Sequence, residues 1–286
     1  MRRLLACSFL VWTAVAGCVP STPTHPHSSP WPQRLSGRAA DANRAADADL
    51  LNAWTSDPSD SLQARVAAMQ ALPAVVDIHV GTARLATTAP AHGAARDAAR
   101  PSTGSGVVIG SDGLILTNEH VIRNARVITV SMDDGTSHPV IRTVVHPLLD
   151  LAILKINAGD LPALRMADQE PQRGDLVVAI GGPSFRESDP VRHGVITHME
   201  VSLQRALDRQ RTRLYEHLME STTRIEPGFS GGALLNTEGD LIGLNVAVSG
   251  HPESAQCRGY AIVLRVDIQE AVEALLQQIS TESPGE

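Results

Sequence analysis

Three short stretches of the sequence carry side chains that could together cleave an amide bond. Ser230 lies in Pro-Gly-Phe-Ser-Gly-Gly (227–232), where the glycines let the backbone expose a hydroxyl and turn N–H groups toward an oxygen beside it. His120 follows the apolar run 114–117, and Asp150 directly precedes another apolar run. A base must take the proton of an attacking serine, and a buried carboxylate can orient that base and stabilise its charged form. These residues therefore predict acyl transfer.

The order of the three residues narrows the class of enzyme. In α/β-hydrolases the serine comes before its partners and its turn leads into a helix, whereas here His120 and Asp150 come first. β-like residues follow Ser230, and too little chain remains for the rest of such a fold. No two histidines stand at ligand spacing on a helix with a carboxylate nearby, so neither a metal nor another cofactor is expected.

The elements that must position these residues are mostly short strands. Alternating or apolar runs bounded by turn residues predict strands at 76–80, 106–109, 114–117, 126–132, 139–145, 151–156, 176–180, 194–198, 241–248 and 259–264. Many short strands with few helices indicate an all-β barrel or sandwich. A closing helix is predicted, with Asp267 as its cap and one apolar stripe made of Ile268, Val272, Leu275, Leu276 and Ile279.

Two other segments have helical patterns. Residues 38–72 are rich in alanine and place Leu62, Val66 and Met69 at helical spacing, which predicts one or two short helices packed on the domain. The segment 205–213 is charged and resembles a helical insertion, either a regulatory loop or a solvated surface. Residues 281–286 are expected to form a disordered tail.

The beginning of the chain has the features of an export signal. Two arginines precede the apolar run that ends at Gly17, and Val-Ala-Gly-Cys (15–18) resembles the bacterial lipoprotein box. We expect residues 1–17 to be a signal peptide, Cys18 to be lipidated, and 18–37 to be a flexible tether; a plain signal peptide without lipid is the alternative. Cys257 would then have no internal partner, so no disulfide framework is expected.

Composition excludes one class of partner. The chain of 286 residues has 43% hydrophobic residues and a formal net charge of −7, and its sequence shows no basic face. Nucleic-acid binding is therefore not expected, and the chain is long enough to bury a core of its own.

Several motifs, in the same order along the chain, resemble the HtrA/Deg trypsin-like serine proteases of the bacterial envelope. They are Gly-Ser-Gly-Val-Val-Ile (104–109), Asp-Gly-Leu-Ile-Leu-Thr-Asn-x-His-Val-Ile (112–122), Asp-Leu-Ala-Ile-Leu-Lys (150–155), Ala-Ile-Gly-x-Pro (179–183) and Pro-Gly-x-Ser-Gly-Gly-Ala-Leu-Leu-Asn (227–236). The resemblance implies a protease domain over 73–280, built of two perpendicular six-stranded antiparallel β-barrels with the catalytic residues in the cleft between them. The PDZ domains usual in that family are not expected here, and a homo-oligomer is possible.

The resemblance also implies a role for each site residue. His120 would be the general base and then the general acid, Asp150 would orient it, and Ser230 would be the nucleophile. The N–H groups of Gly228 and Ser230 would form the oxyanion hole. The remaining two positions, Ile225 and Val248, would line a specificity pocket that favours a small apolar side chain.

Three positions depart from the family pattern. Phe229 and Gly182 stand where the family usually has asparagine, and Glu119 stands where it has histidine or asparagine. The ring of Phe229 lies between the two expected oxyanion donors and could rotate the Gly228 peptide, leaving the hole unformed.

Two functions follow from these observations. The first is a serine endopeptidase, anchored through Cys18 to a bacterial membrane and facing the periplasm or the exterior, that cuts unfolded or exposed polypeptides. The second is a catalytically silent lipoprotein of the same fold that binds peptides as a chaperone or adaptor, a reading that rests on Phe229.

Overall fold

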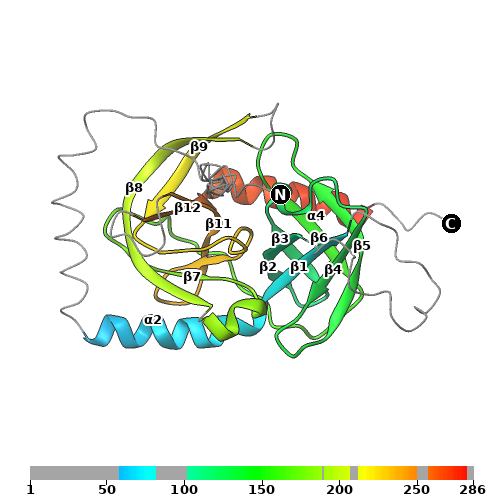
Figure 1. Ribbon diagram of the computed structural model, residues 1–286, viewed down its shortest axis with the longest axis horizontal. Coiled ribbons are helices and arrows are strands. Elements are labelled where there is room, and N and C mark those ends of the chain that lie inside the picture. The colour runs from blue at the N-terminus through cyan, green and yellow to red at the C-terminus, as the bar shows by residue number, and fades with distance from the viewer. Residues whose placement is uncertain (1–57, 82–101, 189, 207–211, 250–256, 282–286) are drawn as a thin grey trace, which may run out of the picture. The chain divides into compact units, whose positions relative to one another are not determined.

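The computed structural model describes residues 58–81, 102–188, 190–206, 212–249 and 257–281, which contain two closed antiparallel barrels of six strands each (Figure 1). In the first barrel the strand order is β1-β2-β3-β6-β5-β4, and in the second it is β10-β11-β12-β9-β8-β7. The strands of the first are β1 (Val75–Gly81), β2 (Ser102–Gly110), β3 (Leu114–Thr117), β4 (Val127–Ser131), β5 (Ser137–Val145) and β6 (Ala152–Ile156). Those of the second are β7 (Leu176–Ile180), β8 (Val191–Ala206), β9 (Thr212–Ser221), β10 (Ala233–Leu235), β11 (Leu241–Ser249) and β12 (Arg258–Val263). The predicted pair of six-stranded barrels is confirmed.

The strands around the site are apolar on both faces, because one face fills a barrel and the other contacts the neighbouring barrel. Ile115 and Leu154 belong to the core inside the first barrel. The adjacent residues Leu116 and Ile153 belong to a second cluster, which they share with Val178 and other residues of the second barrel. Successive side chains of a strand point to opposite faces, so one short apolar run serves both purposes.

A helix near each end of the described chain bridges the barrels. Helix α4 (Val266–Thr281) follows β12 of the second barrel but packs on β5 and β6 of the first. Helix α2 (Pro58–Ala71) leads through the short 3-10 helix η2 (Leu72–Ala74) into β1 of the first barrel but contacts β7 of the second (Figure 1). The predicted closing helix is confirmed, although it begins at Val266 and places Asp267 inside its first turn.

The packing face of α2 is the opposite of the one predicted. Leu62, Val66 and Met69 are 63%, 46% and 71% exposed. The buried side consists of small residues, namely Ala64, Ala67, Ala68 and Ala71. A Cβ built at Gly239 would lie only 3.5 Å from that of Ala67, so the alanines allow the helix backbone to come close to the barrel.

Several strand assignments also differ from the prediction, since β8 (Val191–Ala206) extends well beyond the predicted 194–198 and β9 (Thr212–Ser221) was not among the predicted strands. Strand β2 begins at Ser102, four residues before the predicted start, because β1 continues to pair with it as far as Ser102. The helical interpretation of 205–213 is wrong for the residues that the structure describes, since Arg205 pairs with Arg213 and Ala206 with Thr212 in the β8–β9 hairpin. Residues 207–211 lie outside the described part.

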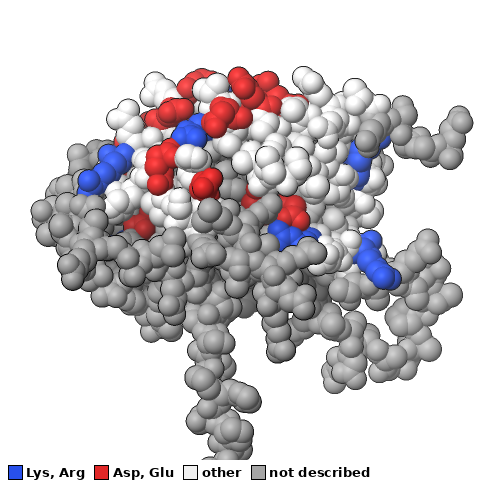
Figure 2. Space-filling view, turned by 90° about the horizontal axis from the view of Figure 1, so that it is seen from above, with Lys and Arg blue, Asp and Glu red and all other residues white. Residues whose placement is uncertain are grey.

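The surface of the described residues matches the acidic composition. Figure 2 shows one face on which acidic side chains gather while basic side chains do not form a patch. None of the described helices is long and apolar enough to cross a membrane. The predicted signal peptide, Cys18 and the tether precede residue 58 and lie outside the described residues. Cys257, the cysteine that is described, is buried and free, and burial raises the pKa of its thiol.

Candidate active site

His120 lies on α3 (Glu119–Ile122), a single helical turn directly after β3. Val121 and Ile122 are buried in the core of the first barrel and fix the turn from inside. On the outside, Glu119 pairs with Arg123, and this ion pair raises the pKa of the Arg123 guanidinium. The turn therefore holds His120 at the surface of the first barrel, with its side chain 12% exposed.

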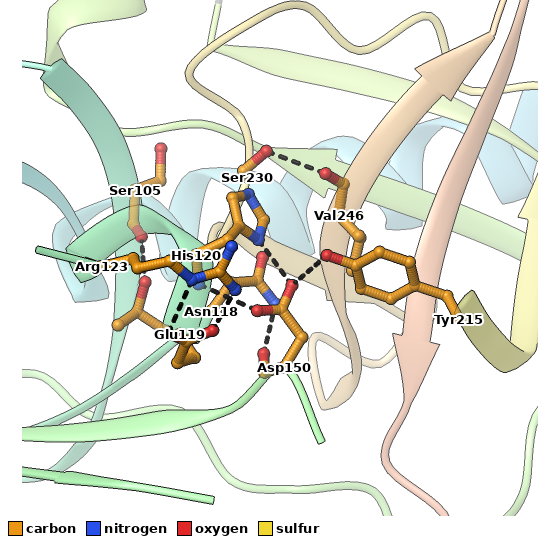
Figure 3. Close-up of polar contacts among 10 residues, drawn as sticks. Ser105, Asn118, Glu119, His120, Arg123, Asp150, Tyr215, Ser230 and Val246 are labelled. Atoms are coloured by element: carbon orange, nitrogen blue, oxygen red, sulfur yellow. Dashed lines mark hydrogen bonds and ion pairs between the residues drawn. The ribbon is translucent and has the colours of Figure 1, made fainter. Parts of the chain in front are cut away.

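Asp150 meets His120 at two points. Its Oδ2 lies 2.5 Å from His120 Nδ1, and its Oδ1 accepts the backbone N–H of His120 over 2.9 Å (Figure 3). The Asp150 side chain is 1% exposed, so it faces the imidazole without competition from water. A carboxylate at Nδ1 selects the tautomer with hydrogen on that nitrogen, which leaves Nε2 as the basic atom.

A tight turn presents Asp150 between β5 and β6. His146 Nδ1 accepts hydrogen bonds from the backbone N–H of Leu149 over 2.9 Å and from that of Leu148 over 3.3 Å. The backbone N–H of His146 donates to the carbonyl of Leu151. Two N–H donors on one ring nitrogen require it to carry no hydrogen. Burial lowers the pKa of His146, which also favours the neutral ring. The backbone carbonyl of Asp150, the next residue of the turn, accepts a hydrogen bond from Asn118 Nδ2 over 3.0 Å.

Sequence reasoning missed Tyr215. Its hydroxyl donates to Asp150 Oδ2 over 3.0 Å, and the residue is 5% exposed (Figure 3). Tyr215 belongs to β9 of the second barrel, 65 positions from Asp150 in the sequence. No local pattern marks it, because the contact exists only once the two barrels have packed together.

Ser230 lies in a loop fastened to both barrels. Its carbonyl accepts the N–H of Ser105 from β2 over 2.8 Å, and the following Gly231 donates its N–H to Asn245 of β11 over 2.8 Å. The hydroxyl of Ser230 donates to the carbonyl of Val246 over 2.9 Å. In Figure 3 the His120 ring is drawn between the Asp150 carboxylate and the side chain of Ser230. The structure thus brings the three sequence-predicted residues into one neighbourhood.

The residues before Ser230 form a type II turn. The Phe229 N–H donates to the Glu226 carbonyl over 3.1 Å, and Gly228 has φ +103°, the positive value that this turn requires at its third position. Ser105 Oγ donates to the Gly228 carbonyl over 2.7 Å and holds the turn from the first barrel. Among the described residues, nothing accepts the backbone N–H of Gly228 or of Ser230. The absence of an acceptor for both N–H groups among the described residues is what an oxyanion hole requires.

The ring of Phe229 lies inside the second barrel. It is 0% exposed, its centroid lies 4.7 Å from that of Phe185, and the Arg192 guanidinium lies 5.8 Å from it. A Cβ built at Gly228 would lie 2.6 Å from the Phe185 ring, so the same aromatic pair also packs against the turn. The aromatic residue at this position is thus accommodated together with the positive φ of Gly228.

Of the two residues predicted to line the specificity pocket, the structure describes the side chain of Ile225 but not that of Val248. Ile225 is 2% exposed and belongs to the second-barrel core. Val248 pairs with Gly259 through β11 and β12, and its side chain lies outside the described part.

The structure also explains why position 182 is a glycine instead of the asparagine usual in the family. A Cβ at Gly182 would lie 2.3 Å from Asp77 Oδ1. Among the described residues, no group of three or more His, Cys, Asp or Glu could hold a metal ion.

Comparisons with known proteins show what this chain is similar to. A family profile described as the trypsin-like peptidase domain matches residues 104–244. The periplasmic serine endoprotease DegP of Escherichia coli is 38% identical over 148 residues, which cover 51% of this chain and 30% of that protein. The chain spans about a third of the length of the curated relatives it matches, with 37% and 30% of the first two covered.

Solved structures show the same fold. The serine endoprotease from Yersinia pestis superposes with a TM-score of 0.56 and 31% identity, over 74% of this chain and 66% of that one. The HtrA-type protease AlgW with a tripeptide gives a TM-score of 0.57 and 28% identity, over 74% of this chain and 64% of that one.

Proposed function

Because this chain belongs to the trypsin-like serine proteases of the HtrA type, we propose that it is a serine endopeptidase with Ser230 as its nucleophile. The observation that carries the proposal is the double contact between Asp150 and His120, at Nδ1 and at the backbone N–H. That contact fixes the imidazole with Nε2 as the base, the state in which it can accept a serine proton.

The reaction proceeds in two halves. Ser230 Oγ attacks the peptide carbonyl while its proton passes to His120 Nε2, and Asp150 stabilises the imidazolium that forms. The N–H groups of Gly228 and Ser230 bind the oxyanion, consistent with their lack of an acceptor among the described residues. His120 then gives the proton to the leaving amine as the C–N bond breaks. A water molecule repeats the sequence on the acyl-enzyme and releases Ser230.

The serine hydroxyl must turn before it can react. It donates to the Val246 carbonyl over 2.9 Å, and in the reaction it must donate to His120 Nε2 instead, a change that rotation about the Cα–Cβ bond would allow. The three staggered positions of a serine χ1 interconvert easily, so substrate binding can select the reactive one.

The proposed substrates are unfolded or exposed polypeptide segments in the bacterial envelope. Support comes from the similarity to a periplasmic serine endoprotease. A buried aliphatic residue at position 225 fits a preference for a small apolar side chain before the cleaved bond. Lipidation of Cys18 would hold the protein at a membrane; the mass of the detergent-extracted chain tests the lipid, and the size of the extracted particle tests whether the chain forms a homo-oligomer.

The direct test compares the full-length chain with Ser230→Ala on dye-labelled unfolded casein. We expect cleavage by the wild type, none above background by the variant, and the same thermal unfolding midpoint for both. Equal cleavage by both proteins would refute the proposal. A silent peptide-binding lipoprotein would show no cleavage by either; that alternative is not favoured, since Phe229, the residue that suggested it, is accommodated inside the second barrel.

A further inference from the structure

Tyr215 brings a hydrogen-bond donor from the second barrel to the carboxylate that holds His120. Its hydroxyl donates over 3.0 Å to Asp150 Oδ2, the same oxygen that lies 2.5 Å from His120 Nδ1. Tyr215 is 5% exposed and the Asp150 side chain 1%, so water cannot easily replace this donor. Because the proposed function requires a correctly oriented imidazole, we propose that Tyr215 is a positioning residue for the His120–Asp150 pair.

The hydroxyl has two effects on the carboxylate. It fixes the rotation of the carboxyl group, since Oδ1 is held by the His120 N–H and Oδ2 by Tyr215. By donating to Oδ2 it also disperses the negative charge of the carboxylate, and such a hydrogen bond to an ion is stronger than one between neutral groups. Without the hydroxyl, the negative charge of the Asp150 carboxylate would be less dispersed, so it would attract the imidazolium more strongly. The rotation of the carboxyl group would no longer be fixed, so the imidazole ring would be less well oriented. The pair would release its proton at a higher pH, and the chemical step would slow.

The local backbone of the β8–β9 hairpin is shaped to aim Tyr215 inward. Tyr215 pairs with Leu203, and both side chains are buried. The next two residues of β9, Glu216 and His217, are both exposed, which breaks the alternation of a regular strand. The pairing shifts register in this region, and His217 has φ +58°, a value that is rare outside glycine.

An ion-pair group on the outer surface braces this irregular backbone. Glu200, opposite on β8, also has positive φ (+57°), and its carboxylate contacts both His217 and Arg265. Strained backbone persists only where its surroundings hold it, and here the residue that it aims inward reaches Asp150. The strain therefore supports a functional role for the inward side chain.

The chain contains a matched control. It has two tyrosines, and the other, Tyr260 of β12, also donates over 3.0 Å to a buried carboxylate, that of Glu220. Tyr260 is 1% exposed. Tyr215→Phe and Tyr260→Phe therefore remove the same group from the same kind of partner, and only the first touches Asp150. The other charged groups beside the pair, Glu119 of α3 and Arg123 directly after it, are unchanged in both variants.

The experiment measures kcat and KM of the full-length wild type and both variants on dye-labelled casein from about pH 5 to about pH 9. For Tyr215→Phe we expect kcat to fall about tenfold, KM to stay within about twofold, and the acid limb of the kcat profile to move up by as much as about one pH unit. Tyr260→Phe should change neither, while both variants lose a similar amount of thermal stability. Equal losses of kcat in the two variants, or an unmoved acid limb in Tyr215→Phe, would overturn the inference.

A second variant covers the case in which Tyr215→Phe does not fold. Incorporating 3-fluorotyrosine into the Tyr260→Phe chain labels position 215 alone, because the sequence has no third tyrosine. The more acidic phenol is a stronger donor, so the acid limb should move to lower pH; an unchanged or raised limb contradicts the inference. A wild type without any proteolysis would refute the proposed function together with this inference, whereas an active wild type with an unaffected Tyr215→Phe would refute the inference alone.

Discussion

Replacing Gly228 with alanine should disable the proposed oxyanion hole without removing any polar atom. Gly228 has φ +103°, which lies beyond the left-handed region that an L-residue tolerates. The added Cβ would also lie 2.6 Å from a carbon of the Phe185 ring, closer than nonbonded carbons approach. The turn can escape both problems by adopting the type I form, whose third residue has negative φ and whose central peptide is reversed.

The expected loss of kcat follows from the conformation that the turn adopts to relieve this strain. Keeping an alanine at positive φ costs about 1–2 kcal/mol, and the collision with a buried aromatic ring adds to that. Reversing the peptide avoids both terms but points the N–H of residue 228 away from the oxyanion. Losing one such donor lowers kcat by about 10²–10³, or roughly 3–4 kcal/mol. We therefore expect a fall of this size in kcat and a small change in KM.

Gly135→Ala is the matched control. Gly135 has φ +84°, but no atom lies within 4 Å of an added Cβ. This variant should lose about 1–2 kcal/mol of stability and keep its kcat. Casein cleavage and thermal unfolding of the three proteins separate the two effects. If Gly228→Ala kept its kcat within about twofold, the assignment of the residue 228 N–H as an oxyanion donor would be wrong.

Three further predictions concern the supports of the site. Ser105→Ala removes the donor that lies 2.7 Å from the Gly228 carbonyl, and we expect about a tenfold lower kcat, measured on casein, with KM unchanged. Phe229→Ala empties a fully buried ring site and should reduce the free energy of unfolding in urea by about 3–5 kcal/mol; a loss below about 1 kcal/mol would contradict the packing described. The folded state lowers the pKa of His146 below its usual 6.5, so stability from the neutral ring is present above that value and is lost as pH falls toward the folded-state pKa. Urea midpoints should therefore fall on acidification less in His146→Gln than in the wild type, and an equal fall in both would count against this role.

The sequence was most informative where chemistry and chain reversal depend on local residue types. The strand ends beside His120 and Asp150 could be predicted because apolar runs stop at these polar residues, and the Pro-Gly turn before Ser230 could be predicted because its glycine permits positive φ. The family resemblance then gave the two barrels, which the structure confirms. Placing the three site residues near one another followed from that fold.

Features that depend on packing between distant segments were not predictable in this way. Tyr215 reaches Asp150 only through the contact of the two barrels. Helix α2 packs with its alanines because the backbone must approach closely, although hydrophobicity alone favours burial of Leu62 and Met69. The charged segment 205–213 resembled a helical insertion in the sequence, yet at its two ends Arg205 and Arg213 pair with each other across the β8–β9 hairpin. In each case a tertiary contact overrides the local pattern.

The most direct test of the account is chemical labelling of the nucleophile. Treatment of the full-length chain with a fluorophosphonate, followed by peptide mapping in a mass spectrometer, should place one adduct on Ser230. The rate should fall steeply in His120→Ala, because no base then takes the serine proton. The absence of an adduct, an adduct on another residue, or equal labelling of wild type and His120→Ala would contradict the claim that His120, held by Asp150, activates Ser230.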